Sequence, residues 1–155
     1  MVGWQRFSVE MPEMAEAGHR LLYQHGPQAI AFLATLRPDG GPRLHPVCPT
    51  VVDGRLLVGI VDASPKCRDL LRDTRYALHT LPGPVNDDEL YLTGRAIRAG
   101  PDGVAACERG FERDDVHSAD HTVFELDIDV ALRARYEPRP SSAPPVYTRW
   151  RAPRA

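Results

Sequence analysis

The sequence has almost no lysine, few cysteines and no long apolar segment. Of its 19 basic residues, Lys66 is the only lysine and the others are arginines. Cys48, Cys67 and Cys107 form no C-x-x-C motif, which argues against a disulfide framework and a thiolate zinc site. No run approaches the roughly 18 apolar residues that span a bilayer, and the N-terminus has no apolar leader core. We therefore expect a cytoplasmic protein with reduced thiols and no membrane partner.

The charge also excludes a partner class. A formal net charge of -2 gives no general attraction to nucleic acid. The C-terminal segment from Ala131 is an exception, because it holds six arginines and one acidic residue, Glu137. We interpret it as a solvated strand face, with contact to an anionic ligand as the alternative.

Length and apolar content predict one domain over residues 1–155. A chain of 155 residues with 43% hydrophobic residues can bury a substantial core. Near its start, a helix is predicted at about 12–25, because Met14, Ala17, Leu21 and Leu22 fall on one helical face.

Most of the remaining chain is patterned as short strands. Apolar or alternating runs occupy residues 29–37, 42–52, 55–61, 75–81, 89–99, 122–129, 131–137 and 146–150. Pro46 and Pro49 place part of the second run at a sheet edge, because proline donates no ladder hydrogen bond. Two more helices are predicted, at 64–74 and from about Asp102. The pattern predicts a mainly β fold, a small antiparallel barrel with helices outside.

The single lysine falls at the start of the helix predicted at 64–74, whose inner face we assign to Cys67, Leu70, Leu71 and Thr74. Ser64 suits the N-cap and Pro65 the first helical position. Lys66 and Arg68 then oppose the helix dipole, each at a cost of about 0.3–1 kcal/mol. A bound phosphate or carboxylate would reverse that cost. The alternative is that both cations are solvated.

Four segments in this order resemble one family: "AFLATLRPDGGPRLHPV", "DGRLLVG", "SPKCRDLLRDTRYALH" and "YLTGRA". They resemble the FMN-binding split β-barrel family related to pyridoxamine 5′-phosphate oxidase. The resemblance implies a six-stranded antiparallel split β-barrel. It also implies a homodimer with cofactor sites between the subunits. Relatives use FMN or the deazaflavin F420, and a few handle haem.

The resemblance also implies which residues bind the cofactor. Lys66 matches the lysine that holds the phosphate, Ser64 precedes it, and Arg68 lies in the same helical turn. The strand that includes His45, Val47 and Thr50 matches the one that runs along the flavin. The remaining matches are Gly59 and Ile60 before the phosphate loop, Glu89 at the position of a partner subunit's glutamine, and Trp150, which resembles a C-terminal tryptophan near the flavin.

Several positions depart from the vitamin B6 oxidases of that family. His45 and Thr50 replace an arginine and a lysine, Pro65 replaces an arginine, and Ile60 replaces a hydroxyl residue. We therefore expect a flavin-dependent oxidoreductase that uses FMN, or alternatively F420, on an unidentified small organic molecule other than a B6 vitamer. The second hypothesis is a non-catalytic flavin- or haem-binding protein. No catalytic side chain is identified, and we read His117 and His121 as part of a solvated loop rather than a metal site.

Overall fold

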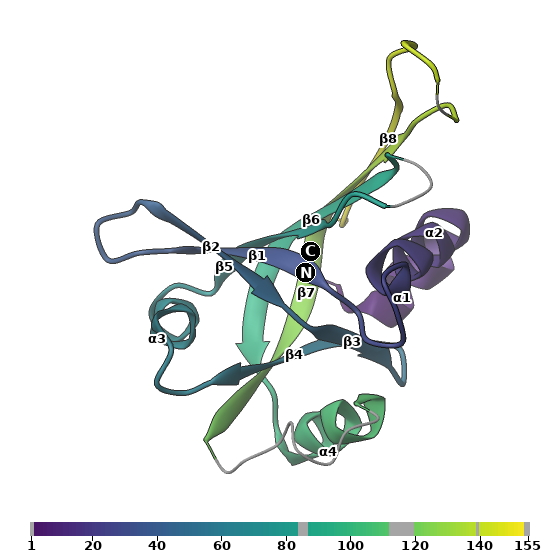
Figure 1. Cartoon of the computed structure of the whole chain (residues 1–155). Coiled ribbons are helices and arrows are strands. Elements are labelled where there is room, and N and C mark those ends of the chain that lie inside the picture. Colours follow the sequence, from purple (N-terminus) through teal and green to yellow (C-terminus); the bar gives the residue numbers. More distant parts are fainter. Residues whose placement is uncertain (1, 84–86, 112–119, 139, 154–155) are drawn as a thin grey trace.

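The computed structural model describes residues 2–83, 87–111, 120–138 and 140–153, and its strands form one curled antiparallel sheet (Figure 1). Along the sheet the order is β2-β1-β5-β6-β7-β4-β3, with β8 paired to β7. The strands are β1 (Ala31–Leu36), β2 (Pro42–Val47), β3 (Pro49–Val52), β4 (Arg55–Val61), β5 (Arg75–Thr80), β6 (Glu89–Arg98), β7 (His121–Arg135) and β8 (Val146–Arg151). The predicted mainly β split-barrel fold is confirmed.

The predicted number of six strands is wrong for the described residues. The sheet has eight strands, or seven if β2 and β3 are counted as one strand bent at Cys48. The two runs predicted at 122–129 and 131–137 form the single strand β7, which continues past a bulge where β6 shifts register between Thr93 and Gly94. Strand β8 extends the sheet beyond β7, where it forms a projecting hairpin (Figure 1).

The two prolines of the second run lie on edge strands, as predicted. Pro46 is in β2 and Pro49 in β3, and these strands are the two ends of the sheet order. An edge strand has one side without a ladder partner, so a missing N–H costs nothing there. The prolines thus help to keep the sheet open between its two ends.

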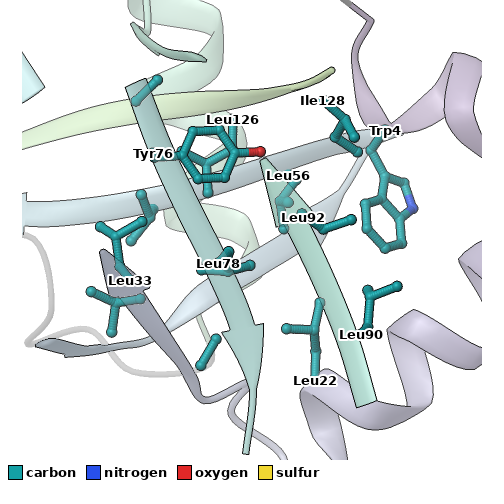
Figure 2. Close-up of a cluster of buried hydrophobic side chains, with 14 of the residues drawn as sticks. Trp4, Leu22, Leu33, Leu56, Tyr76, Leu78, Leu90, Leu92, Leu126 and Ile128 are labelled. Carbon is teal, nitrogen blue, oxygen red and sulfur yellow. The ribbon is translucent and has the colours of Figure 1, made fainter. Parts of the chain in front are cut away.

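Apolar side chains of the inner sheet face fill the barrel (Figure 2). Helices α1 (Trp4–Glu10) and α2 (Pro12–Tyr23) close one end, where Trp4, Phe7 and Leu22 join the same cluster. The four residues predicted for the buried face of α2 are all buried. Helix α1 has no counterpart among the sequence-based predictions. Neither helix, nor any other in the described part, is long and apolar enough to cross a membrane.

Two further helices pack against the sheet at separate places. Helix α3 (Pro65–Arg72) lies against β1 and β4. Helix α4 (Pro101–Gly110) lies against β3, β4 and β7, where Ala106 and Cys107 form a second apolar cluster with Leu57 and Val123. Helix α3 is therefore the element that closes the open side of the barrel.

The bulge between β6 and β7 gives a first prediction. A Cβ atom on Gly94 would lie 1.8 Å from the backbone oxygen of Asp127, so Gly94→Ala forces the two strands apart. We expect this variant to lose about 3 kcal/mol or more of unfolding free energy in urea. Gly100 has open space around its Cβ position, so Gly100→Ala should change stability by less than about 1 kcal/mol. Equal losses in the two variants would contradict this packing argument.

Candidate functional site

The site lies at the split of the barrel, between β2 and the end of β4. Strand β3 pairs with β4 only as far as Val58, so Gly59, Ile60 and Val61 have β7 as a neighbour on one side and no described strand on the other. The outer side of β2 is likewise a sheet edge. Helix α3 begins just after β4 and lies between these edges (Figure 1). Backbone groups, the helix start and the β2 side chains therefore meet in one place.

The start of α3 has the predicted cap. Ser64 is extended, and its side chain accepts a hydrogen bond from the Cys67 backbone N–H at 3.3 Å, with Pro65 as the first helical residue. The first turn holds no acidic residue. The nearby carboxylate of Asp62 accepts a hydrogen bond from the Thr122 hydroxyl at 2.6 Å. Since Cys67 and Arg68 donate their backbone N–H groups to Ser64 and Pro65 has none, the Lys66 N–H is the one that remains available to an anion in this turn.

The two cations of this turn have different surroundings. Arg68 is exposed and donates a hydrogen bond to the backbone oxygen of Ala63 at 2.8 Å, so its side chain bends back along the loop. Lys66 is half-buried, and within the part of the chain that the structure describes its side chain forms no hydrogen bond or ion pair. Lys66 is therefore the unpaired cation at a helix terminus that disfavours cations.

His45 faces the same place from β2. Its Nε2 atom is buried and has no hydrogen-bond partner among the described residues. Burial lowers the pKa of His45, and the positive charges of Lys66 and Arg43 lower it further, while Asp69 opposes them. His45 and Lys66 are thus close enough to repel each other when both are charged. An anion between them would satisfy both.

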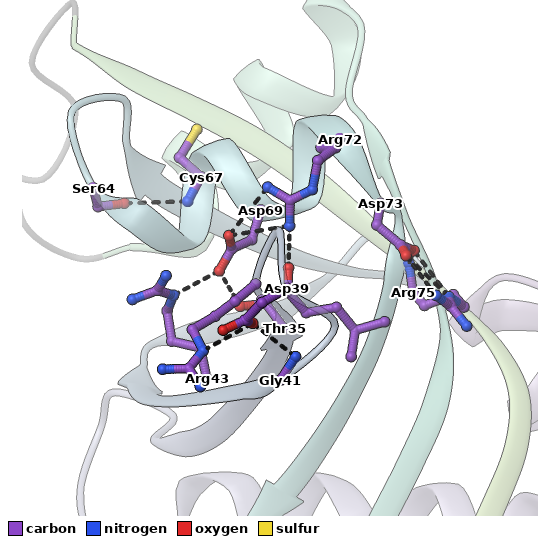
Figure 3. Close-up of polar contacts among 12 residues, drawn as sticks. Thr35, Asp39, Gly41, Arg43, Ser64, Cys67, Asp69, Arg72, Asp73 and Arg75 are labelled. Atoms are coloured by element: carbon purple, nitrogen blue, oxygen red, sulfur yellow. Dashed lines mark hydrogen bonds and ion pairs between the residues drawn. The ribbon is translucent and has the colours of Figure 1, made fainter.

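Asp69 anchors α3 to the sheet (Figure 3). Its carboxylate is 2% exposed and accepts hydrogen bonds from Thr35 of β1 at 2.9 Å, from Arg43 of β2 at 2.6 Å and from Arg72. Burial alone would raise the pKa of Asp69, but the hydrogen bonds from Arg43, Thr35 and Arg72 outweigh it and hold the pKa below its usual value. The carboxylate is therefore charged and fully bonded at neutral pH.

The sequence-based prediction identified neither residue of the ion pair between Asp69 and Arg43. We predicted Leu71 on the inner face of α3, but Leu71 is 57% exposed and Asp69 is buried instead. A helical pattern of apolar residues cannot show that a carboxylate is buried, because its partners come from strands more than 25 residues away. The available signal is that Arg43 and His45 are two apart on a strand and so share a face.

Several predicted site residues lie around the split. Val47 shares the inner face of β2 with His45, and its side chain is buried in the core. The side chain of Ile60 is also in the core, so it can offer only its backbone, as can Gly59. With Ser64, Lys66 and Arg68, these residues form the candidate site.

Three predicted residues have contacts elsewhere. Thr50 is 2% exposed and donates to the Gly110 backbone oxygen at 3.3 Å, which turns it towards α4. The Trp150 indole packs on Phe7 at 5.2 Å between ring centroids, and its N–H donates to Glu10 at 3.1 Å. Glu89 lies on the sheet face opposite His45, beside His79. Within one chain, Glu89 therefore cannot share a site with His45.

The remaining titratable groups form no further centre in the described residues. No group of three or more histidine, cysteine, aspartate or glutamate side chains could hold a metal ion in that part of the chain. His117 lies outside the described residues. Burial raises the pKa of all three thiols, Cys48, Cys67 and Cys107, which makes them poor nucleophiles.

A prediction concerns the anchor of α3. Asp69→Asn leaves Arg43 and Arg72 without their anion, and we expect it to cost about 2–4 kcal/mol of unfolding free energy at pH 7. Because the native pKa of Asp69 is lowered, the difference from wild type should be complete above pH about 4 and shrink as pH falls through the native pKa. Asp73→Asn removes the partner of the exposed Arg75 and is the matched control with a smaller loss. A larger loss in the control would contradict the anchoring role.

A second prediction concerns the neighbours of His45. In NMR titrations of the imidazole protons, the pKa of His45 should lie below about 6.5 in the wild type and rise in Lys66→Gln, because a repelling charge is removed. Arg68→Gln removes an equal charge from the same helical turn, but Arg68 is not among the groups that shift His45. If the pKa of His45 is the same in Lys66→Gln as in the wild type, the two residues do not lie close enough to interact, which would contradict the site.

Comparisons with known proteins establish the fold. No family model matches the sequence, and no curated protein matches it. A solved heme-binding protein from Mycobacterium smegmatis superposes with a TM-score of 0.64 at 19% identity, over 85% of this chain and 57% of the mycobacterial one. This chain thus spans little more than half the length of that protein.

Two other solved structures are similar over most of their own length. A protein of the pyridoxinephosphate oxidase family from Clostridium acetobutylicum, related to general stress protein 26 of B. subtilis, has a TM-score of 0.59 at 13% identity, over 95% of both chains. An F420 reductase has a TM-score of 0.53 at 19% identity, over 73% of this chain and 94% of the reductase. At these identities the likeness supports the split-barrel fold alone.

Proposed function

We propose that the protein binds a flavin-type cofactor by its phosphate at the start of α3 and uses it to transfer electrons to or from a small organic molecule. The proposal rests on two nearby groups that each lack a partner. The Lys66 side chain has none among the described residues, and the buried Nε2 atom of His45 has no hydrogen bond there. Two nitrogen groups that lack partners at a helix N-terminus make a site for an anion with several acceptor oxygens.

The residues present fit a phosphate. Lys66 would hold it as a point charge and would also donate from its backbone N–H, and His45 would donate from Nε2. Arg43 brings a further cation to the same face of β2, and its Nε atom is already fixed by Asp69. Arg43 thus supplies charge in place of the two arginines of the vitamin B6 oxidases that are absent at positions 45 and 65.

The cofactor carries the redox chemistry. A bound FMN or F420 would supply the hydride or electron transfer, while this chain binds the phosphate, orients the ring system along β2 and excludes water. FMN is the primary assignment and F420 the alternative. The F420 reductase among the structural relatives supports the alternative, as do the exposed Arg149 and Arg151 of β8, which suit an acidic tail. No side chain is assigned a catalytic role.

A homodimer is part of the proposal. The outer face of β1, β5, β6 and β7 carries Phe32, Ala34, Ala77, Tyr91 and Leu132, which are half-exposed side chains of neighbouring strands. A second copy of the chain on this face would bury them. Since Glu89 lies on this outer face, it could reach only the site of a partner subunit.

A binder without turnover is the second candidate, and two contacts favour it. Thr50 is bonded to Gly110 and Ile60 lies in the core, so two positions that hold polar ligands in the vitamin B6 oxidases are not free here. Fewer contacts to a flavin are consistent with storage or sensing. The heme-binding structural relative extends this candidate to haem.

The test begins with titration of the purified protein with FMN, F420 and haem, followed by absorbance and fluorescence. Lys66→Ala should weaken binding of FMN or F420 by about 10- to 100-fold, the value of one charge-assisted hydrogen bond. Arg20→Ala on the exposed face of α2 is the control and should leave the affinity unchanged.

The outcomes separate the candidates. An enzyme reoxidises its reduced cofactor faster when an organic acceptor is added, whereas a binder does not. If the wild type and Lys66→Ala bind the cofactor equally tightly, Lys66 does not hold its phosphate. Absence of binding for all three compounds would end the oxidoreductase proposal.

A further inference from the structure

A second candidate ligand site lies at the corner where β2 turns into β3. A cavity of about 280 Å³ opens between the end of α2, the loop that leads to β1, and the end of α4. Its walls include Tyr23, Pro27, Gln28, Ala29, Pro49 and Phe111, and no residue of α3 lines it. The cavity is therefore distinct from the cluster of Lys66 and His45.

Among the described residues that line the cavity, the Tyr23 phenol is the only titratable side chain, and none is charged. An ionised ligand would lose its hydration there without gaining a counter-charge from these residues, which favours an uncharged ligand. The rings of Tyr23, Phe111, Pro27 and Pro49 give the cavity apolar faces. Such faces suit a planar aromatic molecule, which gains from offset stacking as well as from burial.

Tyr23 is a fixed wall of the cavity. Its hydroxyl accepts a hydrogen bond from the Val51 backbone N–H at 3.1 Å and lies 3.4 Å from the Thr50 hydroxyl. Its ring stacks on His19 with 4.6 Å between centroids. The phenol is therefore already bonded to the protein and oriented before any ligand arrives.

Gln28 is the other polar side chain among the described lining residues. Its side chain is half-exposed and has no hydrogen bond to any described residue. The amide offers both a donor and an acceptor, so it can bond a neutral N–H, a hydroxyl or a carbonyl group. In a site with apolar walls, one such group fixes the orientation of a ligand.

We propose that this cavity binds a small, uncharged, planar aromatic compound of one or two rings, with Gln28 bonded to its polar group. The cavity volume lies just below the usual range of about 300–1,000 Å³ for ligand pockets, which limits the size of the ligand. The proposal concerns binding alone and does not depend on the cofactor at α3.

The experiment uses indole as the probe and two-dimensional NMR of the full chain. Indole should shift the backbone signals of Tyr23, Gln28 and Ala29 in a saturable manner. Gln28→Leu should weaken binding roughly 3- to 10-fold, the value of a neutral hydrogen bond. Gln5→Leu makes the same change at an exposed position of α1 and should have no effect. Lys66→Ala should also bind indole normally, which separates this site from the proposed cofactor site.

Two further measurements test where indole binds and whether the site prefers an uncharged ligand. Ala29→Leu puts a larger side chain into the wall of the cavity and should therefore abolish the indole shifts. Its melting temperature shows whether the variant folds. Indole-2-carboxylate should bind at least tenfold more weakly than indole. The proposal is overturned if indole gives no saturable shifts, if Gln28→Leu binds as tightly as wild type, or if the carboxylate binds as well as indole.

Discussion

The buried carboxylate of Asp69 is the interaction on which the candidate site depends. The two ends of the sheet do not pair with each other, so hydrogen bonds between strands cannot set the width of the split. Asp69 ties α3 to Thr35 of β1 and Arg43 of β2 through short hydrogen bonds. This contact fixes the helix start relative to β2. The positions of Lys66 and His45 follow from it.

The electrostatics of the split follow from the same contact. Asp69 neutralises part of the charge of Arg43 and Arg72, but it is fully engaged with them and with Thr35. The positive charge of Lys66 and the N-terminal dipole of α3 therefore remain uncompensated. Burial of the imidazole and the charges of Lys66 and Arg43 disfavour a charged His45. Such a site costs stability in the free protein, because each cation there raises the free energy of the others. Binding of an anion would recover that free energy, which is why an unfavourable arrangement indicates a ligand.

The sequence predicted the elements better than their partners. Alternation along β6, the apolar face of α2 and the cap at Ser64 are local patterns, and the structure has each of them. The burial of Asp69 and the hydrogen bond from Thr50 to Gly110 of α4 arise from contacts between distant segments, which periodicity does not encode. The boundary between the runs predicted at 122–129 and 131–137 was wrong for a related reason, since a bulge let β7 continue through a change of pattern. Lys66 was found because it breaks both a compositional bias and a helix-end rule.

The most direct test of the anion site is the pKa of His45, measured by NMR with and without saturating FMN or F420. Burial and the charges of Lys66 and Arg43 lower this pKa, and the negative charge of a phosphate bound beside Lys66 would favour the imidazolium, so we predict a clear rise on binding. The unbound protein should keep the lowered value. A cofactor that binds tightly but leaves the pKa of His45 unchanged would place its phosphate elsewhere and contradict the account.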